Sequence, residues 1–399
     1  MDIIDNIISF IVLILYLIIN PMFITGFILL IFLYNILSIY SSFQRIKKIR
    51  NYYSFRNIEI EDLDKTPFVN FIIPAWKESE TLIRTLKNLK ELNYPKYKVI
   101  VNAGGNQKTI DIAKSFEQSN KFKILIQESG KGKIRAINDC LKVIDKGIIY
   151  LLDADVLINE NLLLNMIFPI TNNGESVVVS PLKPYKDFRE KDIVKYTFII
   201  RQTNISKEIS NYTNKIGPNT VIDYKAIKMI KQFTEGQYSD DNLVIAGDLI
   251  RNNFKILHIR EYEGEIYLPP NIKELFNQNL RWIGNSYFRS KNKGNYRFLA
   301  KYYTFFFVSL FFLLLPLIMI LEFKLFWIWL IIFLMYYIKR IGRVILFKIS
   351  FGKQIPFSYG FIFYIKIALF LYVDILIKIV SLIEITFFKS KYKNRKNLD

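Results

Sequence analysis

The chain of 399 residues is 51% hydrophobic and 16% aromatic, which is high for a soluble protein, so we expect part of it to lie in lipid. Its formal net charge of +20 favours contact with anionic lipid headgroups or an anionic substrate. Nucleic acid is discounted as a partner because the cations cluster beside apolar segments and form no basic groove interleaved with aromatic residues. The single cysteine, Cys140, excludes an internal disulfide, and the single histidine, His258, excludes a histidine-cluster metal site.

The N-terminal segment is expected to be a membrane region. Residues 7–43 contain no charged side chain, and as one helix they would be about 55 Å long against roughly 30 Å of hydrocarbon. Asn20-Pro21 favours a turn near the middle, so residues 1–43 are predicted to form two transmembrane helices, with one long or kinked helix as the alternative. The basic residues at 45–50 then place the following domain in the cytoplasm by the positive-inside rule.

Residues 51–295 alternate between strand-like and helix-like runs and are predicted to form one cytoplasmic domain. Strands are predicted at 68–73, 97–102, 122–127 and 148–153, and helices at 79–92, 108–119 and 131–144. Helices of about a dozen residues between short strands rich in Val and Ile predict an α/β domain with a parallel sheet and right-handed crossovers. In such a sheet, ligands bind beyond the carboxyl ends of the strands.

Two carboxylates separated by one small residue end the fourth predicted strand. Asp153 and Asp155 project to the same side of an extended segment, so both face one point at the strand end. Carboxylate oxygens, completed by substrate phosphates, are the ligands that Mg²⁺ prefers. The alternative is an ordinary turn, where Asp is common.

The loops after the other strands also carry candidate binding groups. Glu78 stands at a helix start, where its carboxylate would accept hydrogen bonds from a base or ribose, or would simply complement the helix dipole. The loop at 102–106 allows a ligand close to the backbone and is also a good turn. Gly130-Lys131-Gly132-Lys133 brings two cations to a helix N-terminus, which favours phosphate.

The order of these motifs resembles the GT-A nucleotide-sugar domain of glycosyltransferase family 2. Downstream, Ser239-Asp240-Asp241 resembles the Thr-Glu-Asp acceptor-site motif of that family, and residues 278–282 match its Gln-x-x-Arg-Trp motif. The flanking apolar segments are similar to those of membrane-bound members such as cellulose, chitin and hyaluronan synthases. The resemblance implies a GT-A fold, Rossmann-like with a mostly parallel sheet, flanked by transmembrane helices.

The resemblance also implies a role for each matching residue. By this resemblance, Asp155, with Asp153 beside it, binds the metal, Mg²⁺ or Mn²⁺, and Asp241 is the catalytic base. Donor or nucleotide binding falls to Glu78, Asn102, Gly104, Lys133 and Asp153. Binding of the acceptor or the diphosphate falls to Asp240, Gln278, Arg281 and Trp282.

Two departures from the family pattern stand out. The family usually carries Asp in the second loop, where it helps to bind the base, but Asn102 and Ala103 stand here, which puts the identity of the nucleotide in doubt. Ser-Asp-Asp replaces Thr-Glu-Asp and keeps the final carboxylate at Asp241.

The Gln-x-x-Arg-Trp segment has a physical reading of its own. Gln278, Arg281 and Trp282 share one helix face at i, i+3 and i+4. Arg281 would stabilise a leaving diphosphate, and Trp282 would offer a stacking surface for an acceptor sugar. The alternative is an amphipathic helix on the membrane, with Trp and Arg as interfacial anchors.

The region 302–388 is predicted to hold C-terminal transmembrane or interfacial helices. Residues 302–321 are uncharged and about one bilayer long, 325–338 would return, and cations from 339 to 353 mark the cytoplasmic side again. Residues 357–388 are apolar but charged in places, so either Asp374 and Lys378 neutralise each other inside a bundle or the segment lies in the interface. A basic tail at 389–399 closes the chain.

Together these features predict an integral cell-membrane protein with a cytoplasmic catalytic domain. The predicted reaction is inverting transfer of a sugar, from a UDP-sugar by resemblance, to a polysaccharide or lipid acceptor. A lipid-phosphate sugar synthase is an alternative enzyme. A non-catalytic membrane scaffold that retains the fold is an alternative of another class, which the departure at Asn102 and Ala103 favours and the intact acidic motifs oppose.

Overall fold

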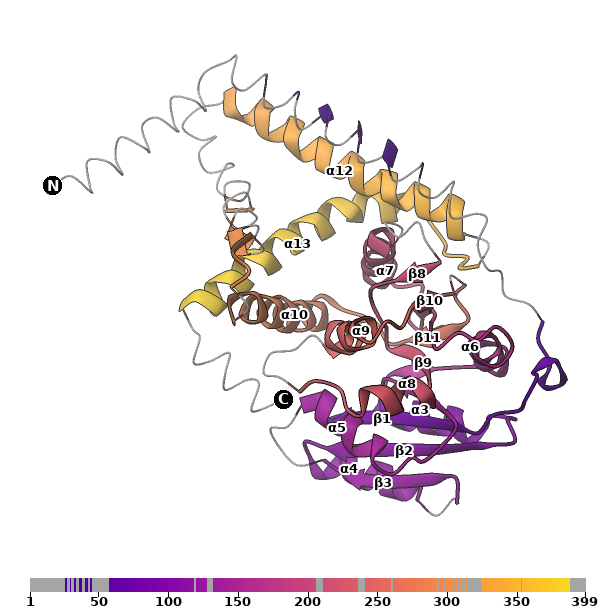
Figure 1. Cartoon of the computed structure of the whole chain (residues 1–399). Coiled ribbons are helices and arrows are strands. Elements are labelled where there is room, and N and C mark those ends of the chain that lie inside the picture. The colour runs from indigo at the N-terminus through magenta and orange to yellow at the C-terminus, as the bar shows by residue number, and fades with distance from the viewer. Residues whose placement is uncertain are drawn as a thin grey trace.

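The computed structural model describes most of the chain after residue 56. The described residues are 57–117, 120–127, 132–205, 211–235, 241–259, 261–292, 294–297, 299–300, 324–352 and 354–387, with single positions between 26 and 44 and between 302 and 313. They form an α/β domain beneath a group of long helices (Figure 1).

An eight-stranded sheet organises the α/β domain, in the order β3-β2-β1-β4-β9-β6-β10-β8. Its strands are β1 Val69–Trp76, β2 Tyr97–Gly104, β3 Phe122–Ile126, β4 Ile148–Leu152, β6 Val177–Val179, β8 Tyr212–Thr213, β9 Asn219–Asp223 and β10 Ile256–His258. Strands β3, β2, β1 and β4 are parallel, whereas β9 runs antiparallel between β4 and β6. A second, three-stranded sheet contains β5 Val156–Leu157, β7 Leu182–Pro184 and β11 Gly264–Ile266.

The predicted alternation of strands and helices up to β4 is confirmed. The helices are α3 Glu80–Lys90, α4 Gln107–Ser115, α5 Gly132–Leu141, α6 Glu160–Asn172, α7 Asp192–Ile205, α8 Tyr224–Ile230, α9 Asp241–Arg251, α10 Ile272–Asn292, α12 Lys324–Phe351 and α13 Phe361–Phe387, with the short η1 Ile60–Asp62 before β1. Cys140 is buried on α5, and His258 lies buried in β10.

Strands β1 and β2 run further than predicted, and Pro74 lies inside β1. The backbone N–H groups of Val69 and Lys77 point to the β2 side, so the position of Pro74 faces the β4 side. Pairing of β1 with β4 ends at Ile72, and the missing N–H of Pro74 therefore costs no ladder hydrogen bond. The functional loops begin at the ends of these longer strands.

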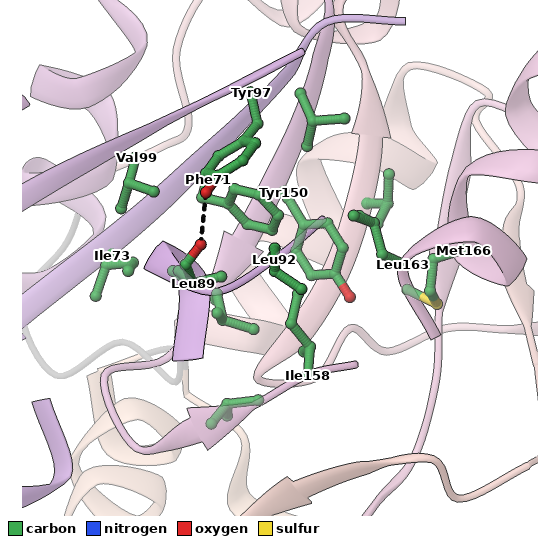
Figure 2. Packing of buried hydrophobic residues seen from close by; sticks show 14 of the residues in the cluster. Phe71, Ile73, Leu89, Leu92, Tyr97, Val99, Tyr150, Ile158, Leu163 and Met166 are labelled. Carbon is green, nitrogen blue, oxygen red and sulfur yellow. Dashed lines mark hydrogen bonds between the residues drawn. The ribbon is translucent and has the colours of Figure 1, made fainter. Parts of the chain in front are cut away.

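The sheet is buried on both faces, as its runs of apolar residues require. Phe71 packs against Tyr150 at 4.9 Å between ring centroids on one face, and the Tyr97 hydroxyl donates to the Leu89 carbonyl at 2.7 Å (Figure 2). Ile72 belongs to the cluster on the other face. Strands packed on both sides give the loops after them a rigid base.

Helices α7, α10, α12 and α13 pack together around a separate apolar cluster. Phe198 of α7 lies within 5.7 Å of the rings of Phe347 and Phe357. The Asp374 carboxylate on α13, whose neutralisation by Lys378 was one of two alternatives for this segment, pairs with Arg340 of α12 at 3.0 Å and accepts a hydrogen bond from the Tyr196 hydroxyl of α7 at 2.7 Å. Asp374 also acts electrostatically on Lys378. The C-terminal helices are therefore joined to the α/β domain through α7.

No helix in the described part of the chain combines the length and apolar character needed to cross a bilayer. The predicted segments 7–43 and 302–321 and the tail at 389–399 lie outside the continuously described residues. The predicted segment 325–338 lies within α12, and the predicted segment 357–388 largely within α13.

Candidate functional site

The Asp-x-Asp pair lies directly after β4, where the sequence placed it. The Asp153 backbone N–H donates to the Pro218 carbonyl at 3.0 Å, which ties this turn to the chain before β9. The Asp153 side chain pairs with Lys133 from the first turn of α5, with 2.5 Å between Nζ and Oδ1. The third and fourth strand–helix units therefore meet at this carboxylate.

Negative charge is concentrated around Asp155. Burial, with the neighbouring carboxylates of Asp153 and Glu78, raises the pKa of Asp155 to about 7, although Lys133 acts against the rise. Burial and the neighbouring carboxylates both disfavour the ionised form of Asp155, and Lys133 alone does not offset them. A bound cation would reverse this balance.

The residues present fit a hard divalent cation that takes further ligands from its substrate. Among the described residues, no group of three or more His, Cys, Asp or Glu side chains is arranged to hold a metal by itself. Mg²⁺ and Mn²⁺ sites of the substrate-completed kind use one or two carboxylates, with phosphates and water for the rest. Asp153 and Asp155 supply two carboxylates, and the excess of negative charge around Asp155 would favour binding of a cation.

Asp241 belongs to the same electrostatic cluster. It is the first residue of α9, and its carboxylate acts on Lys133 together with those of Asp153 and Asp155. Burial alone would lower the pKa of Lys133, but these acidic groups raise it above its ordinary value. The predicted base is thereby placed beside the predicted metal ligands. Asp240 lies outside the described residues.

Glu78 lies between β1 and α3, as predicted. Its carboxylate accepts a hydrogen bond from the Thr81 hydroxyl at 2.7 Å, and its carbonyl accepts one from the Thr109 hydroxyl at 2.7 Å. Lys77, just before it, has a positive φ of 54°, which turns the chain out of the strand. The Glu78 carboxylate also contributes to the raised pKa of Asp155, so the two carboxylates act on each other electrostatically.

Asn102 lies inside β2 and not in the loop after it, which corrects the sequence-based placement. Its side chain is buried, and Nδ2 donates to the Ala136 carbonyl of α5 at 3.1 Å, while Oδ1 is buried without a hydrogen-bond partner among the described residues. Alternate residues of a strand face opposite sides, and Asn102 faces α5 together with Ile100. The side chain therefore joins strand to helix.

Gly104 is required by packing. A Cβ there would lie 2.8 Å from the Gln127 carbonyl oxygen and 3.0 Å from the Trp76 ring. Gln127 and Trp76 therefore already fill the space beside the Gly104 Cα. The predicted approach of a ligand to this glycine stays a prediction. Of the third loop, residues 130 and 131 lie outside the described residues, whereas Lys133 reaches the site.

The Gln-x-x-Arg-Trp residues lie on α10 and meet an arginine that the sequence analysis missed. Nη2 of Arg201 on α7 donates to Gln278 Oε1 at 2.6 Å, and its guanidinium lies 4.4 Å from the centroid of the Trp282 ring. Arg281 is exposed, and Trp282 is 43% exposed. One face of the predicted stacking surface is thus covered by Arg201. The available signal was a lone arginine after the apolar run Tyr196–Ile200.

Comparison with known proteins identifies the class of this site. The family model described as "Glycosyl transferase family 2" matches residues 70–233, which include the Asp-x-Asp pair but neither Asp241 nor the α10 motif. Residues 70–233 are therefore similar to glycosyltransferase family 2 domains, and the enzyme class that the match supports is glycosyltransferase.

Relatives and a solved structure add detail. Poly-beta-1,6-N-acetyl-D-glucosamine synthase of Staphylococcus epidermidis is 24% identical over 220 residues, which are 54% of this chain and 53% of that protein. The synthase of the same name from Staphylococcus aureus strain COL is 23% identical over 251 residues, 61% of this chain and 60% of that protein. The alignments thus span little more than half the length of these relatives. The mannosyltransferase PcManGT from Pyrobaculum calidifontis, solved with GDP-Man and Mn²⁺, covers 92% of this chain and 99% of its own with 11% identity and a TM-score of 0.53, which shows a shared fold.

Proposed function

We propose that the chain is an inverting glycosyltransferase that moves a sugar from a nucleoside diphosphate sugar to a polysaccharide or lipid acceptor at the membrane. The observation that carries the proposal is the convergence of Asp153, Asp155 and Asp241 on Lys133. Two carboxylates at a strand end suit a divalent cation, and the third, Asp241 on a separate helix, is the proposed base.

The chemistry follows from these positions. Asp241 takes the proton of the acceptor hydroxyl, whose oxygen bonds to the anomeric carbon while the bond from that carbon to the diphosphate oxygen breaks. The nucleoside diphosphate leaves with the electron pair, and attack from the opposite side inverts the anomeric configuration. Lys133 binds the charge of the leaving group, and the resemblance of the α10 motif assigns the same role to Arg281. A divalent metal held by Asp155 and Asp153 would neutralise further charge on the diphosphate.

UDP-sugars are the proposed donors. The names of the relatives make N-acetylglucosamine the first sugar to test. GDP-mannose, bound by the solved neighbour, is the second, and the Mn²⁺ in that structure supports the choice of metal. The acceptor class is left to experiment: a polymer by analogy with the relatives, or a lipid or lipid phosphate.

Membrane attachment is part of the proposal. The uncharged runs at 7–43 and 302–321 support it, as does the basic segment at 45–50, which assigns residues 51–295 to the cytoplasm. A catalytic domain held at the bilayer would meet a lipid or a membrane-bound polymer directly.

The test is nucleotide release by membranes that contain the full chain, with UDP-N-acetylglucosamine, UDP-glucose and GDP-mannose offered separately with Mn²⁺. We expect release from one donor, and its loss in Asp155→Ala. The matched control is Asp111→Ala on the exposed face of α4. Two results would support the non-catalytic scaffold instead. The unmodified chain would release nucleotide from none of the three donors, or the Asp155→Ala variant would release as much nucleotide as the unmodified chain.

A further inference from the structure

Arg201 makes contacts that link two residues of the α10 motif. Its guanidinium donates to Gln278 Oε1 at 2.6 Å and lies 4.4 Å from the centroid of the Trp282 ring. Gln278 and Trp282 are one helical turn apart, so a single planar group spans both. α7 and α10 lie between the sheet and helices α12 and α13 (Figure 1).

The chemistry of the guanidinium sets the orientation of the amide. Arginine has only donors, so Gln278 must turn its oxygen toward Arg201. The amide NH₂ of Gln278 is then turned away from Arg201, as a donor toward whatever binds beside α10. On the Trp282 ring, the guanidinium covers one face and leaves a side chain that is 43% exposed.

The contacts of Arg201 with Gln278 and Trp282 suit arginine better than lysine. Desolvation lowers the pKa of Arg201 to about 10, opposed by the charge of Asp374, so the group stays charged at neutral pH. Within the described residues, no carboxylate lies within 4 Å of the guanidinium, so an amide and an aromatic ring are its close partners. A lysine would keep the charge but would lose the planar stacking and the fixed direction of the N–H groups.

Helix α7 is itself held by the C-terminal helices. The Tyr196 hydroxyl donates to Asp374 on α13, and Arg340 of α12 pairs with the same carboxylate. Asp374 also acts electrostatically on Arg201. The position of Arg201 therefore depends on α12 and α13 as well as on the α/β domain.

We propose that Arg201 is a positioning residue for the acceptor side of the site, which fixes Gln278 as a hydrogen-bond donor and presents one face of Trp282 to an acceptor sugar. This inference rests on the proposed function, because only transfer needs an acceptor. It assigns sugar transfer, and not donor binding, to the contact between α7 and α10.

Activity measurements on membranes that contain the full chain test the assignment. The probe is radiolabelled donor, chosen as the one that the unmodified chain uses, with the acceptor present in those membranes. Arg201→Lys should lower transfer about 10- to 100-fold while the KM for donor changes less than about twofold. The effect of Arg201→Lys should shrink in a Gln278→Ala background, because both changes remove one interaction. The matched control is Gln202→Ala, which lies on the same helix as Arg201 and whose side-chain oxygen accepts a hydrogen bond from the Tyr262 hydroxyl; this variant should transfer normally.

A second measurement does not need activity. Arg201→Gln should increase quenching of tryptophan fluorescence by acrylamide, and the increase should vanish in a Trp282→Phe background. In the transfer assay, the inference would be overturned by normal transfer in Arg201→Lys, by an equal loss in Gln202→Ala, or by additive effects of Arg201→Lys and Gln278→Ala. In the fluorescence assay, it would be overturned by an increase in quenching that does not depend on Trp282. Failure of the proposed function is distinct: the unmodified chain would release no nucleotide, and the fluorescence comparison would still report whether Arg201 holds Trp282.

Discussion

Nζ of Lys133 lies 2.5 Å from Oδ1 of Asp153, so the cation that opens α5 contacts the carboxylate that ends β4. Asp155 and Asp241 act on the same ammonium group. A diphosphate entering the site would compete with these carboxylates for Lys133 and would bring its own oxygens to the Asp-x-Asp pair. The contact therefore predicts how the donor is held.

Lys133→Met should weaken donor binding about 10- to 100-fold, because a charge-assisted hydrogen bond is worth about 1.5 to 3 kcal/mol. The measurement is equilibrium binding of radiolabelled donor to the purified protein with Mn²⁺. Lys108→Met, an exposed lysine of α4, is the control and should bind normally. Equal affinities for both variants would remove Lys133 from the donor site.

Metal binding should depend on pH through Asp155. Its pKa of about 7 leaves the carboxyl mostly protonated below pH 7, so Mn²⁺ affinity should fall about tenfold per unit below that pH and level off above it. By the same shift, the contribution of this carboxyl to the stability of the metal-free protein is lost as the pH rises from about 4 to about 7, because only the fold favours the neutral form over that range. Free Mn²⁺ measured by paramagnetic resonance at pH 6, 7 and 8 tests this prediction. Asp155→Asn should bind weakly at every pH.

Asp241→Asn should lower turnover about 10²- to 10⁴-fold, because it keeps the shape of the side chain and removes its basicity. Donor affinity should change little, because the residues proposed to bind the donor lie in the separate loops after β1, β2, β3 and β4. Asp240→Asn should lose much less turnover. Turnover and donor affinity of both variants, measured side by side, decide the assignment: a dead Asp240→Asn beside an active Asp241→Asn would move the base by one residue.

Asn102→Ala should destabilise the protein by about 1 to 2 kcal/mol through the lost hydrogen bond to the Ala136 carbonyl, and it should leave nucleotide preference unchanged. Asn102→Asp should cost more, because a buried carboxylate would face a carbonyl oxygen. Thermal unfolding of the purified variants gives the stabilities, and competition between UDP and GDP gives the preference. A changed preference without a loss of stability would return Asn102 to a base-binding role.

The membrane proposal predicts resistance to extraction by alkaline carbonate, because uncharged runs such as 7–43 are held by apolar burial and not by charge. It also predicts that Ser115→Cys, exposed at the end of α4, resists a membrane-impermeant maleimide on intact cells and reacts after lysis. The native thiol, Cys140, is buried and should give little background. Efficient labelling of intact cells would reverse the topology.

The sequence by itself determined the order of strands and helices from β1 to β4, because the repeat of apolar residues differs between a strand and a helix and is readable locally. It also placed Asp153 and Asp155 at a strand end, since an apolar run that stops at two carboxylates marks that end. The resemblance to glycosyltransferase family 2 rested on these local patterns.

Only the tertiary structure decided what the remaining residues face. Strand β2 continues past Asn102 because β1 pairs with it to Gly104, and that register turns the Asn102 side chain to α5. Asp241 acts electrostatically on Lys133, and Arg201 donates a hydrogen bond to Gln278, across long stretches of chain. Local periodicity encodes which side of an element is apolar but not which element packs there, so contacts between helices far apart in the sequence follow from packing of the whole chain.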